Sequence, residues 1–207
     1  MRDVCFGLED NRYESKLLEL LSEKCIYGYL VKNMDSLGFL LRNNLMDQND
    51  RKIVTADAGI YTYNYLSKKL LEKYINTYTI PYELNLAELL NLGLEGIEIP
   101  VYGRIPMMVT ANCIKKTSTG CDIGKRSEYY DFSKTNNKLF LSDRYQVKFP
   151  VVCDCSHCFN IIYNSVPISL HQYMGRFEQE NPHSFRIDLT IESAAESNEI
   201  LHYFEKI

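Results

Sequence analysis

The sequence predicts an α/β fold built from repeated βα units. Three observations support this prediction. Short apolar segments alternate with amphipathic segments over the first hundred residues, the alternation stops at Gly103, and it returns near residue 183. The five strands of this type are too few to close an eight-stranded (β/α) barrel. We therefore expect either an open parallel sheet or a piece of a barrel, with an irregular, cysteine-bearing insertion before the last βα unit.

The first half of the repeat alternates helix and strand. Residues 13–24 have the leucine spacing of an amphipathic helix, and residues 25–31 are aromatic and β-branched, as in a buried strand. Asp35 and Ser36 are predicted to cap the next helix. Residues 52–57 form the next predicted strand and residues 61–75 the next helix.

Two further strands complete the first region, residues 1–103. Residues 78–82 and 97–102 are predicted strands, and they flank a helix that opens with a capping box from Asn85 to Glu88. Gly93 and Gly96 mark the end of this helix. Parallel strands with crossover helices follow from this order of elements.

The second region, residues 104–182, has no repeating period and carries most of the cysteines. Residues 138–144 and 146–151 alternate around a turn and predict a β-hairpin. The third region, residues 183–207, resumes the βα pattern with a strand over 185–190. Its last helix opens with a capping box from Ser193 to Glu196.

Composition narrows the class of protein. The 207 residues are 45% hydrophobic and 24% charged, which is typical of a globular protein, and the net charge of −4 disfavours a protein built to bind nucleic acid by charge alone. A local basic excess comprises Lys115, Lys116, Lys125 and Arg126. No signal peptide, no apolar run of membrane-spanning length and no disulfide framework is recognised, so we expect a cytoplasmic protein with no membrane partner.

Four cysteines form a predicted ligand set. They are Cys113, Cys121, Cys155 and Cys158, and the last two make a Cys-x-x-Cys step suited to one metal or one cluster. The seven residues between Cys113 and Cys121 are a wider gap than compact zinc sites use, which favours an iron–sulfur cluster, with zinc or unligated thiols as alternatives. Cys153 is either buried or a substitute ligand, and Cys5 and Cys25 are ordinary core or surface residues.

Charged residues at strand ends are the candidate catalytic groups. Asp57, Glu83, Arg104 and Asp188 take such places, where barrels assemble their active sites. They either form a polar ring around a substrate or serve as helix caps and internal ion pairs. Arg104 follows a glycine and is suited to bidentate binding of a carboxylate or phosphate, and Arg144 and Arg186 are weaker candidates for that role.

Several catalytic motifs are absent from the sequence. It contains no His-Glu-x-x-His, no Gly-x-Ser-x-Gly and no Gly-rich nucleotide loop. His157 lies within the Cys-x-x-Cys step, and His171, His183 and His202 have no partner that the sequence identifies as a catalytic pair.

Five stretches resemble the collagenase-like peptidases of unknown catalytic type, family U thirty-two. They are residues 81–89, 98–108, 143–150, 158–165 and 186–192, in the order in which that family has them. The chain departs from the family signature at Pro100, Arg104, Pro106 and Ala111. Pro106 stands where the signature has its first cysteine, and Cys113 matches the second. The resemblance extends from about residue 27 to the end and is to the later half of the family's fold.

The resemblance implies a TIM-like barrel and a four-iron four-sulfur cluster. It implies a function in oxygen-independent hydroxylation of RNA or of a small aromatic, or else a peptidase acting on proteins. Because only the later half of a barrel is present, the alternatives include a homo-oligomer and a non-catalytic, metal-stapled fragment. Such a fragment would pair with a chain that supplies the N-terminal barrel half.

Overall fold

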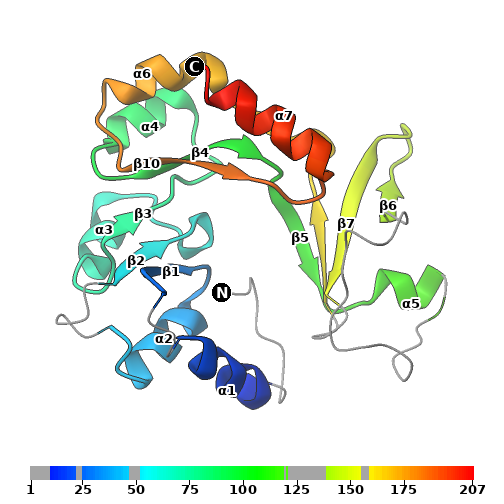
Figure 1. Ribbon diagram of the computed structural model, residues 1–207, viewed down its shortest axis with the longest axis horizontal. Coiled ribbons are helices and arrows are strands. Elements are labelled where there is room, and N and C mark those ends of the chain that lie inside the picture. Colours follow the sequence, from blue (N-terminus) through cyan, green and yellow to red (C-terminus); the bar gives the residue numbers. More distant parts are fainter. Residues whose placement is uncertain (1–9, 22–24, 47–51, 119, 121–138, 155–158) are drawn as a thin grey trace. The chain divides into compact units, whose positions relative to one another are not determined.

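A computed structural model describes residues 10–21, 25–46, 52–118, 120, 139–154 and 159–207. Within these residues the chain is a mixed α/β structure with three sheets, none of which closes into a barrel (Figure 1). The chain divides into two compact units. Unit 1 comprises residues 1–100 and 173–186, and unit 2 comprises residues 101–172 and 187–207.

Unit 1 contains the predicted parallel βα repeat. Strand β1 (Gly28–Val31) pairs in parallel with β2 (Ile53–Ala56), and β2 pairs in parallel with β3 (Thr77–Tyr78). A parallel bridge from Thr79 to Glu98 continues this order to β4 (Glu98–Gly103). The connecting helices are α2 (Met34–Arg42), α3 (Tyr65–Leu71) and α4 (Leu86–Leu92), and α1 (Asp10–Leu21) precedes them. The alternation predicted for this region is confirmed.

Asparagines set the starts of the three connecting helices. Asn33 caps α2 by accepting a hydrogen bond from the Ser36 backbone N–H at 2.8 Å, so the prediction that Asp35 or Ser36 is the cap was wrong. Asn64 and Asn85 open α3 and α4 with capping boxes, as predicted for Asn85. The helix expected over 61–75 shortens to α3, because Asn64 takes the extended conformation of an N-cap.

The two faces of the β1–β2–β3 sheet differ in polarity. Tyr29, Val31, Val54 and Ala56 turn one face toward helices α2 and α3 and form an apolar core with them. Because side chains alternate along a strand, the residues between them turn to the opposite face. That face carries the register partners Leu30, Thr55 and Thr77. The second face therefore carries two threonine hydroxyls beside Leu30, and we call it the polar face of the sheet.

Unit 2 contains an antiparallel sheet in the order β5-β8-β7-β6. Its strands are β5 (Pro106–Thr110), β6 (Leu139–Ser142), β7 (Lys148–Asp154) and β8 (Phe159–Tyr163). The predicted hairpin is confirmed as β6 and β7, with Phe140 opposite Pro150. The other two strands were not predicted, and they show that much of the region 104–182 is regular antiparallel structure.

Two strands begin in unit 1 and end in unit 2. They are β4 and β10 (Ser184–Asp188), which lie side by side in one sheet (Figure 1). Strand β9 (Ile168–Ser169) pairs antiparallel with the end of β4 in unit 2. Helix α6 (Met174–Glu178) belongs to unit 1, whereas α5 (Ile114–Ser118) and α7 (Ala194–Phe204) belong to unit 2. The predicted capping box Ser193–Glu196 opens α7.

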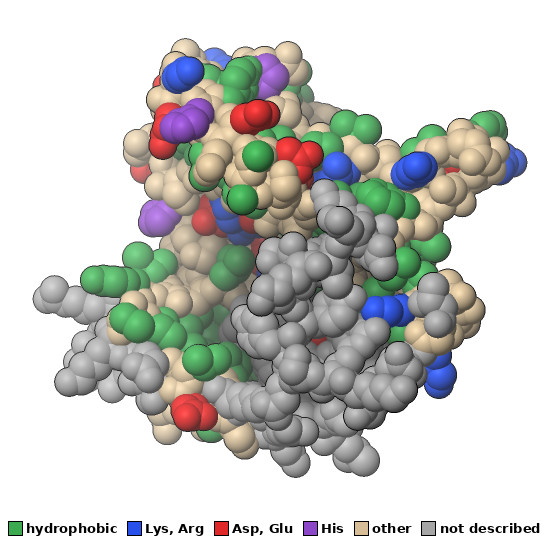
Figure 2. Space-filling model, turned by 45° about the vertical axis from the view of Figure 1, so that its right-hand side comes forward, with side chains coloured by type: hydrophobic (Ala, Val, Ile, Leu, Met, Phe, Trp, Pro, Cys, Tyr) green, Lys and Arg blue, Asp and Glu red, His purple; other side chains and the backbone are tan. Residues whose placement is uncertain are grey.

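None of the described helices is long and apolar enough to span a bilayer. Large hydrophobic side chains do reach the described surface, where Figure 2 shows them in green beside Lys and Arg side chains in blue. In unit 1 the most exposed of them include Tyr61, Tyr65, Leu66 and Leu70.

Candidate functional site

The predicted cysteine ligand set falls in unit 2, and Cys113 is its one member among the described residues. Cys121, Cys155 and Cys158 lie outside them. Cys113 is half-buried between β5 and α5, and its Sγ accepts a hydrogen bond from the Lys116 backbone N–H at 3.4 Å. Hydrogen bonds of this kind to cysteine sulfur tune the potential of protein-bound clusters.

The strand termini nearest to the predicted cysteine ligands lie at the same end of the antiparallel sheet. Asp154 ends β7 and Phe159 begins β8, and these two residues are cross-strand partners. Thr110 ends β5 and is the cross-strand partner of Asn160. The residues that bracket 155–158 and the residues that lead to Cys113 therefore meet at the same end of the β5-β8-β7 sheet.

Asn160 joins these segments directly. Its Nδ2 donates to the Thr110 carbonyl oxygen at 3.2 Å and to the Asn112 carbonyl oxygen at 3.0 Å, so it pins the backbone immediately before Cys113. The residue is 1% exposed, and its Oδ1 has no hydrogen-bond partner within the part of the chain that the structure describes. The amide thus fixes the approach to Cys113 from the interior of the sheet.

The remaining described cysteines separate into core and surface. Cys153 is buried on β7 as the cross-strand partner of Asn160, which is one of the two places the sequence allowed for it. Cys25 is exposed, and Cys5 lies outside the described residues. The described residues contain no group of three or more His, Cys, Asp and Glu suited to a metal ion, and three of the four predicted ligands lie outside them.

A second site lies on the polar face of the parallel sheet in unit 1. Arg186 on β10 donates from Nη2 to Asp57 at 2.9 Å and from Nη1 to Glu98 at 2.6 Å. The guanidinium also contacts the Thr79 hydroxyl and the Tyr82 hydroxyl, each at 3.3 Å. The Arg186 guanidinium thus links Asp57, which follows β2, with Thr79, which follows β3, and with Glu98, which begins β4.

The cluster around Arg186 is largely removed from water. The side chains of Arg186, Asp57 and Glu98 are 15%, 15% and 17% exposed. Thr79, whose hydroxyl also donates to Glu98 at 2.9 Å, is fully buried. Two carboxylates facing one guanidinium give the cluster an excess of negative charge and fix the geometry of this sheet face.

Glu83 lies in unit 1 as well and contacts a tyrosine. The Tyr63 hydroxyl donates a hydrogen bond to Glu83. Burial raises the pKa of Tyr63 above its ordinary value, and the hydrogen bond to Glu83 and the negative charge of that residue raise it further. The phenol therefore stays neutral and remains a donor over the physiological pH range.

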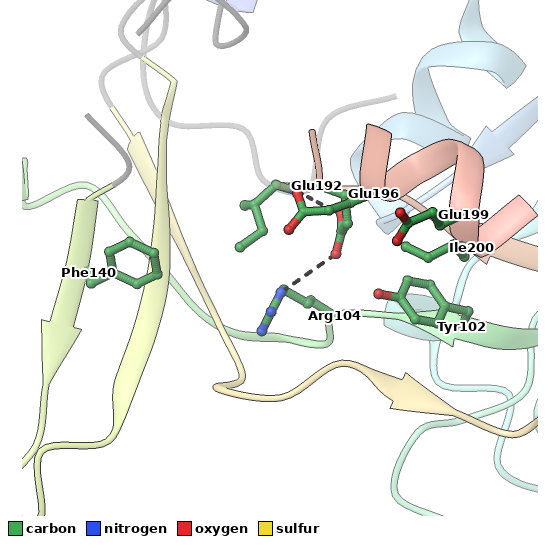
Figure 3. A pocket seen from close by; sticks show the side chains of 8 residues that line it. Tyr102, Arg104, Phe140, Glu192, Glu196, Glu199 and Ile200 are labelled. Carbon is green, nitrogen blue, oxygen red and sulfur yellow. Dashed lines mark hydrogen bonds and ion pairs between the residues drawn. The ribbon is translucent and has the colours of Figure 1, made fainter. Parts of the chain in front are cut away.

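Arg104 lies in unit 2, and backbone oxygens engage its guanidinium. Nη1 donates to the carbonyl oxygens of Asn164 and Ser165 at 2.9 and 2.8 Å, and Nε lies 3.8 Å from a Glu192 carboxylate oxygen. Arg104 also borders a pocket of about 370 Å³ (Figure 3). The pocket is lined by Tyr102, Arg104, Phe140, Ile191, Glu192, Glu196, Glu199 and Ile200.

Two carboxylates of this pocket, Glu192 and Glu196, already have structural partners. Glu192 accepts the backbone N–H groups of Thr190 and Ile191 at 2.6 and 3.0 Å, and Glu196 closes the capping box of α7. Burial raises the pKa of Tyr102, the Glu192 charge adds to this rise and the Arg104 charge opposes it. The polar groups around Arg104 thus organise the start of α7.

Of the other predicted candidates, Asp188 packs against the backbone in unit 2, with its Cβ beside the α-carbon of Gly103. Arg144 is exposed at the β6–β7 turn, where its guanidinium lies 4.7 Å from the centre of the Tyr145 ring. The structure therefore groups Asp57 with Arg186 in unit 1, whereas Arg104 and Asp188 belong to unit 2.

Sequence reasoning missed Glu98 and Thr79 as members of the site and ranked Arg186 too low. A usable signal was present, because Glu98 and Arg186 are charged residues flanked on both sides by apolar residues within predicted strands. A charge at such a position on a half-buried strand requires a partner on the same sheet face.

Comparison with known proteins gave no match to this chain among family models, curated proteins or solved structures.

Proposed function

We propose that this chain is an iron–sulfur-binding component of an oxygen-independent enzyme that modifies RNA or a small aromatic compound. Its cluster would be held by Cys113, Cys121, Cys155 and Cys158. The proposal combines the cysteine spacing, the family resemblance and the geometry of the sheet end in unit 2.

The observation that carries the proposal is the convergence of β5, β7 and β8 at one sheet end. Asn160 binds the backbone before Cys113, and its neighbour Phe159 is paired with Asp154 on the other side of residues 155–158. The segment before Cys113 and the residues on either side of 155–158 lie some forty positions apart in the sequence, yet both are anchored at one end of the sheet. This anchoring supports a shared ligand for Cys113 and the Cys-x-x-Cys step.

Two features of the described residues around Cys113 support a cluster at this place. Cys113 is half-buried and receives a backbone N–H, and Asn160 holds the segment rigid from the interior. Four thiolates would be the complete ligand set of a four-iron four-sulfur cluster. A bound cluster would supply electron transfer, whereas the chain's own residues orient the ligands and shield the sheet interior from water.

The parallel sheet of unit 1 supports the second part of the proposal, a partial TIM-like barrel. Strands β1, β2 and β3 form one sheet in chain order, an isolated parallel bridge leads to β4, and β4 lies beside β10 in a second sheet. We propose that these strands correspond to successive barrel strands, and that Asp57, Glu98 and Arg186 line the interior of such a barrel. Among the described strands β1 pairs only with β2. We propose that a partner chain or a second copy adds strands at the β1 edge, and that the protein acts in the cytoplasm.

Anaerobic purification followed by iron, sulfide and zinc analysis tests the cluster. We expect iron and inorganic sulfide in near-equal amounts, and loss of both in a Cys155→Ser, Cys158→Ser double variant and in Cys113→Ser. Cys25→Ser is the matched control, because Cys25 is an exposed thiol outside the set.

Each outcome has a separate meaning. Iron and sulfide that persist in the double variant would contradict the assigned ligands. Stoichiometric zinc without sulfide would make the site structural and would remove the redox function from the proposal. Absence of both metals from the anaerobic protein would refute the proposal as a whole.

A further inference from the structure

Two tyrosine rings stack at the loop that follows β2 in unit 1. The ring centres of Tyr61 and Tyr63 are 5.6 Å apart, and the ring planes are inclined by 15°. These values fall within the range of offset aromatic stacking. Tyr61 nevertheless has 62% of its surface exposed. Most of Tyr61 thus remains open to solvent although Tyr63 stacks on its ring.

The backbone holds Tyr61 in an unfavourable conformation. Its φ of 59° and ψ of 56° lie in the left-handed region, which costs a residue with a side chain about 1–2 kcal/mol. The residue closes the 3-10 turn Ala58–Ile60, and its N–H donates to the Ala58 carbonyl oxygen at 3.1 Å. A strained backbone beneath an exposed ring is a combination that functional sites often show.

The buried ion cluster anchors this turn. Asp57 accepts the Ala58 N–H through Oδ1 at 3.0 Å, and the same oxygen binds Arg186 at 2.9 Å. The start of the turn that carries Tyr61 is thereby tied to the sheet. A preorganised ring lowers the entropy that a ligand must offset on binding.

Tyr63 is anchored from the other side. Its hydroxyl donates to Glu83, which lies beyond β3. The two rings therefore stand where β2 and β3 reach their carboxyl ends, and parallel sheets bind their ligands at this edge.

A basic, aromatic segment follows the rings. Tyr65 is 70% exposed at the start of α3, and the Lys69 ammonium lies 5.7 Å from its ring centre. The preceding Lys68 is half-buried and donates to the Leu92 carbonyl oxygen at 3.5 Å, so Lys69 is the lysine that accompanies the exposed ring. Aromatic rings interleaved with lysines are typical of surfaces that stack bases and attract phosphates.

We propose that Tyr61 and Tyr63 form a stacking platform for a planar aromatic ring of the ligand, either a nucleobase or a small aromatic compound. The free face of Tyr61 receives the ring. The proposal deepens the proposed function by naming the part of the ligand that unit 1 recognises. The stacking itself does not depend on the proposed function; only the reaction after binding does.

The absence of tryptophan from the chain permits a direct test. In a Tyr61→Trp variant the introduced indole is the sole tryptophan, and its fluorescence reports a ring that stacks on it. We would titrate this variant with a short single-stranded RNA and, separately, with para-hydroxybenzoate. Tyr145→Trp is the control, because Tyr145 is 71% exposed but lies in unit 2.

We expect saturable quenching of Tyr61→Trp by at least one probe and only linear, collisional quenching of Tyr145→Trp. Saturation with RNA alone identifies a nucleobase as the ligand, and saturation with para-hydroxybenzoate alone identifies a small aromatic. Linear quenching of Tyr61→Trp by both probes would overturn the proposal.

A second pair of variants keeps the test independent of the introduced indole. Asparagine tolerates the left-handed conformation, so Tyr61→Asn removes the ring without disturbing the turn. We expect Tyr61→Asn to weaken binding of the saturating probe about tenfold and Tyr61→Phe to leave it nearly unchanged. Equal affinity of Tyr61→Asn and the native chain would also overturn the proposal. Binding needs no cluster, so these results and the metal analysis can fail separately.

Discussion

Arg186 is the residue on which the polar face of unit 1 depends, because it forms ion pairs with both Asp57 and Glu98. Replacing it with methionine leaves two poorly hydrated carboxylates 15% and 17% exposed without their counter-ion. Removing one partner of such a pair costs about 3–5 kcal/mol, and residual solvent access favours the lower end. We expect Arg186→Met to lower the free energy of unfolding by about 3 kcal/mol, measured by urea denaturation.

Arg176→Met is the matched control for this prediction. Arg176 pairs with Glu180 at 3.4 Å, but the two side chains are 53% and 31% exposed. A pair of this kind contributes about 0–1 kcal/mol. If both variants lose the same stability, the Arg186 cluster is no more than a surface ion pair.

Tyr63 yields a prediction about pH. Burial, the hydrogen bond to Glu83 and the Glu83 charge raise its pKa above the value of about 10 for a free tyrosine. The folded state thus prefers the neutral phenol, and the stabilisation is complete below about pH 10 and is lost as the pH rises beyond it. Ultraviolet titration of the native chain and of Tyr63→Phe gives the ionisation of Tyr63 as the difference between the two curves. We expect this phenol to be among the last tyrosines to ionise.

Glu83→Gln separates the charge from the hydrogen bond, because the amide oxygen still accepts. We expect the pKa of Tyr63 to fall in this variant but to stay above its ordinary value, since burial is the largest cause of the rise. An unchanged titration would show that Glu83 does not contact the phenol in solution.

At the scale of elements, Gly103 controls how β4 ends beside β10 in unit 2. Its φ is 146°, and a Cβ added there would lie 2.6 Å from the Asp188 Cβ and 2.8 Å from the Asp188 carbonyl oxygen. We expect Gly103→Ala to lower the free energy of unfolding by about 2 kcal/mol or more through combined strain and collision.

Gly93→Ala distinguishes the two contributions to that loss. Gly93 also has a positive φ, of 80°, but an added Cβ would meet no described atom within 4 Å. This variant should lose only the conformational contribution, about 1 kcal/mol. Equal losses in thermal or urea unfolding would mean that the contact with Asp188 is relieved at little cost.

The elements that sequence predicted well are those with local signals. The β1–β4 repeat and α7 follow from hydrophobic period and from capping residues such as Asn85 and Ser193. Strands β5 and β8 escaped prediction because their pattern depends on partners far along the chain. Thr110, for example, pairs with Asn160. Propensity in strands reflects such neighbours more than the residue itself.

The candidate site divides in the same way. Asp57 was predicted from its place at a strand end, and the structure pairs it with Arg186, 129 positions away in sequence. The apolar neighbours of Glu98 indicate that it needs a partner, but no local pattern shows which arginine that partner is, and Thr79 has no local signal. The Tyr61–Tyr63 stack depends on a left-handed turn that composition does not reveal.

At the scale of the whole molecule, the cysteine set and the polar sheet face belong to different units, yet β4 and β10 run through both. Ligands held at the end of β5, β7 and β8 would stabilise unit 2 directly, because bound metal contributes its binding free energy to the structure that forms the site. Unit 1 has its own core of Val31, Leu40 and Val54. Loss of the cluster should therefore act unequally on the two units.

Hydrogen exchange measures this inequality amide by amide. On removal of iron by anaerobic chelation we expect exchange of amides in β5 and β8 to accelerate about tenfold or more, while amides of β1 and β2 change little. The Cys155→Ser, Cys158→Ser variant should reproduce the chelated pattern and should not respond to the chelator. Equal acceleration in both units would show that they unfold as one, and unchanged exchange in β5 and β8 would show that no metal is held at that sheet end.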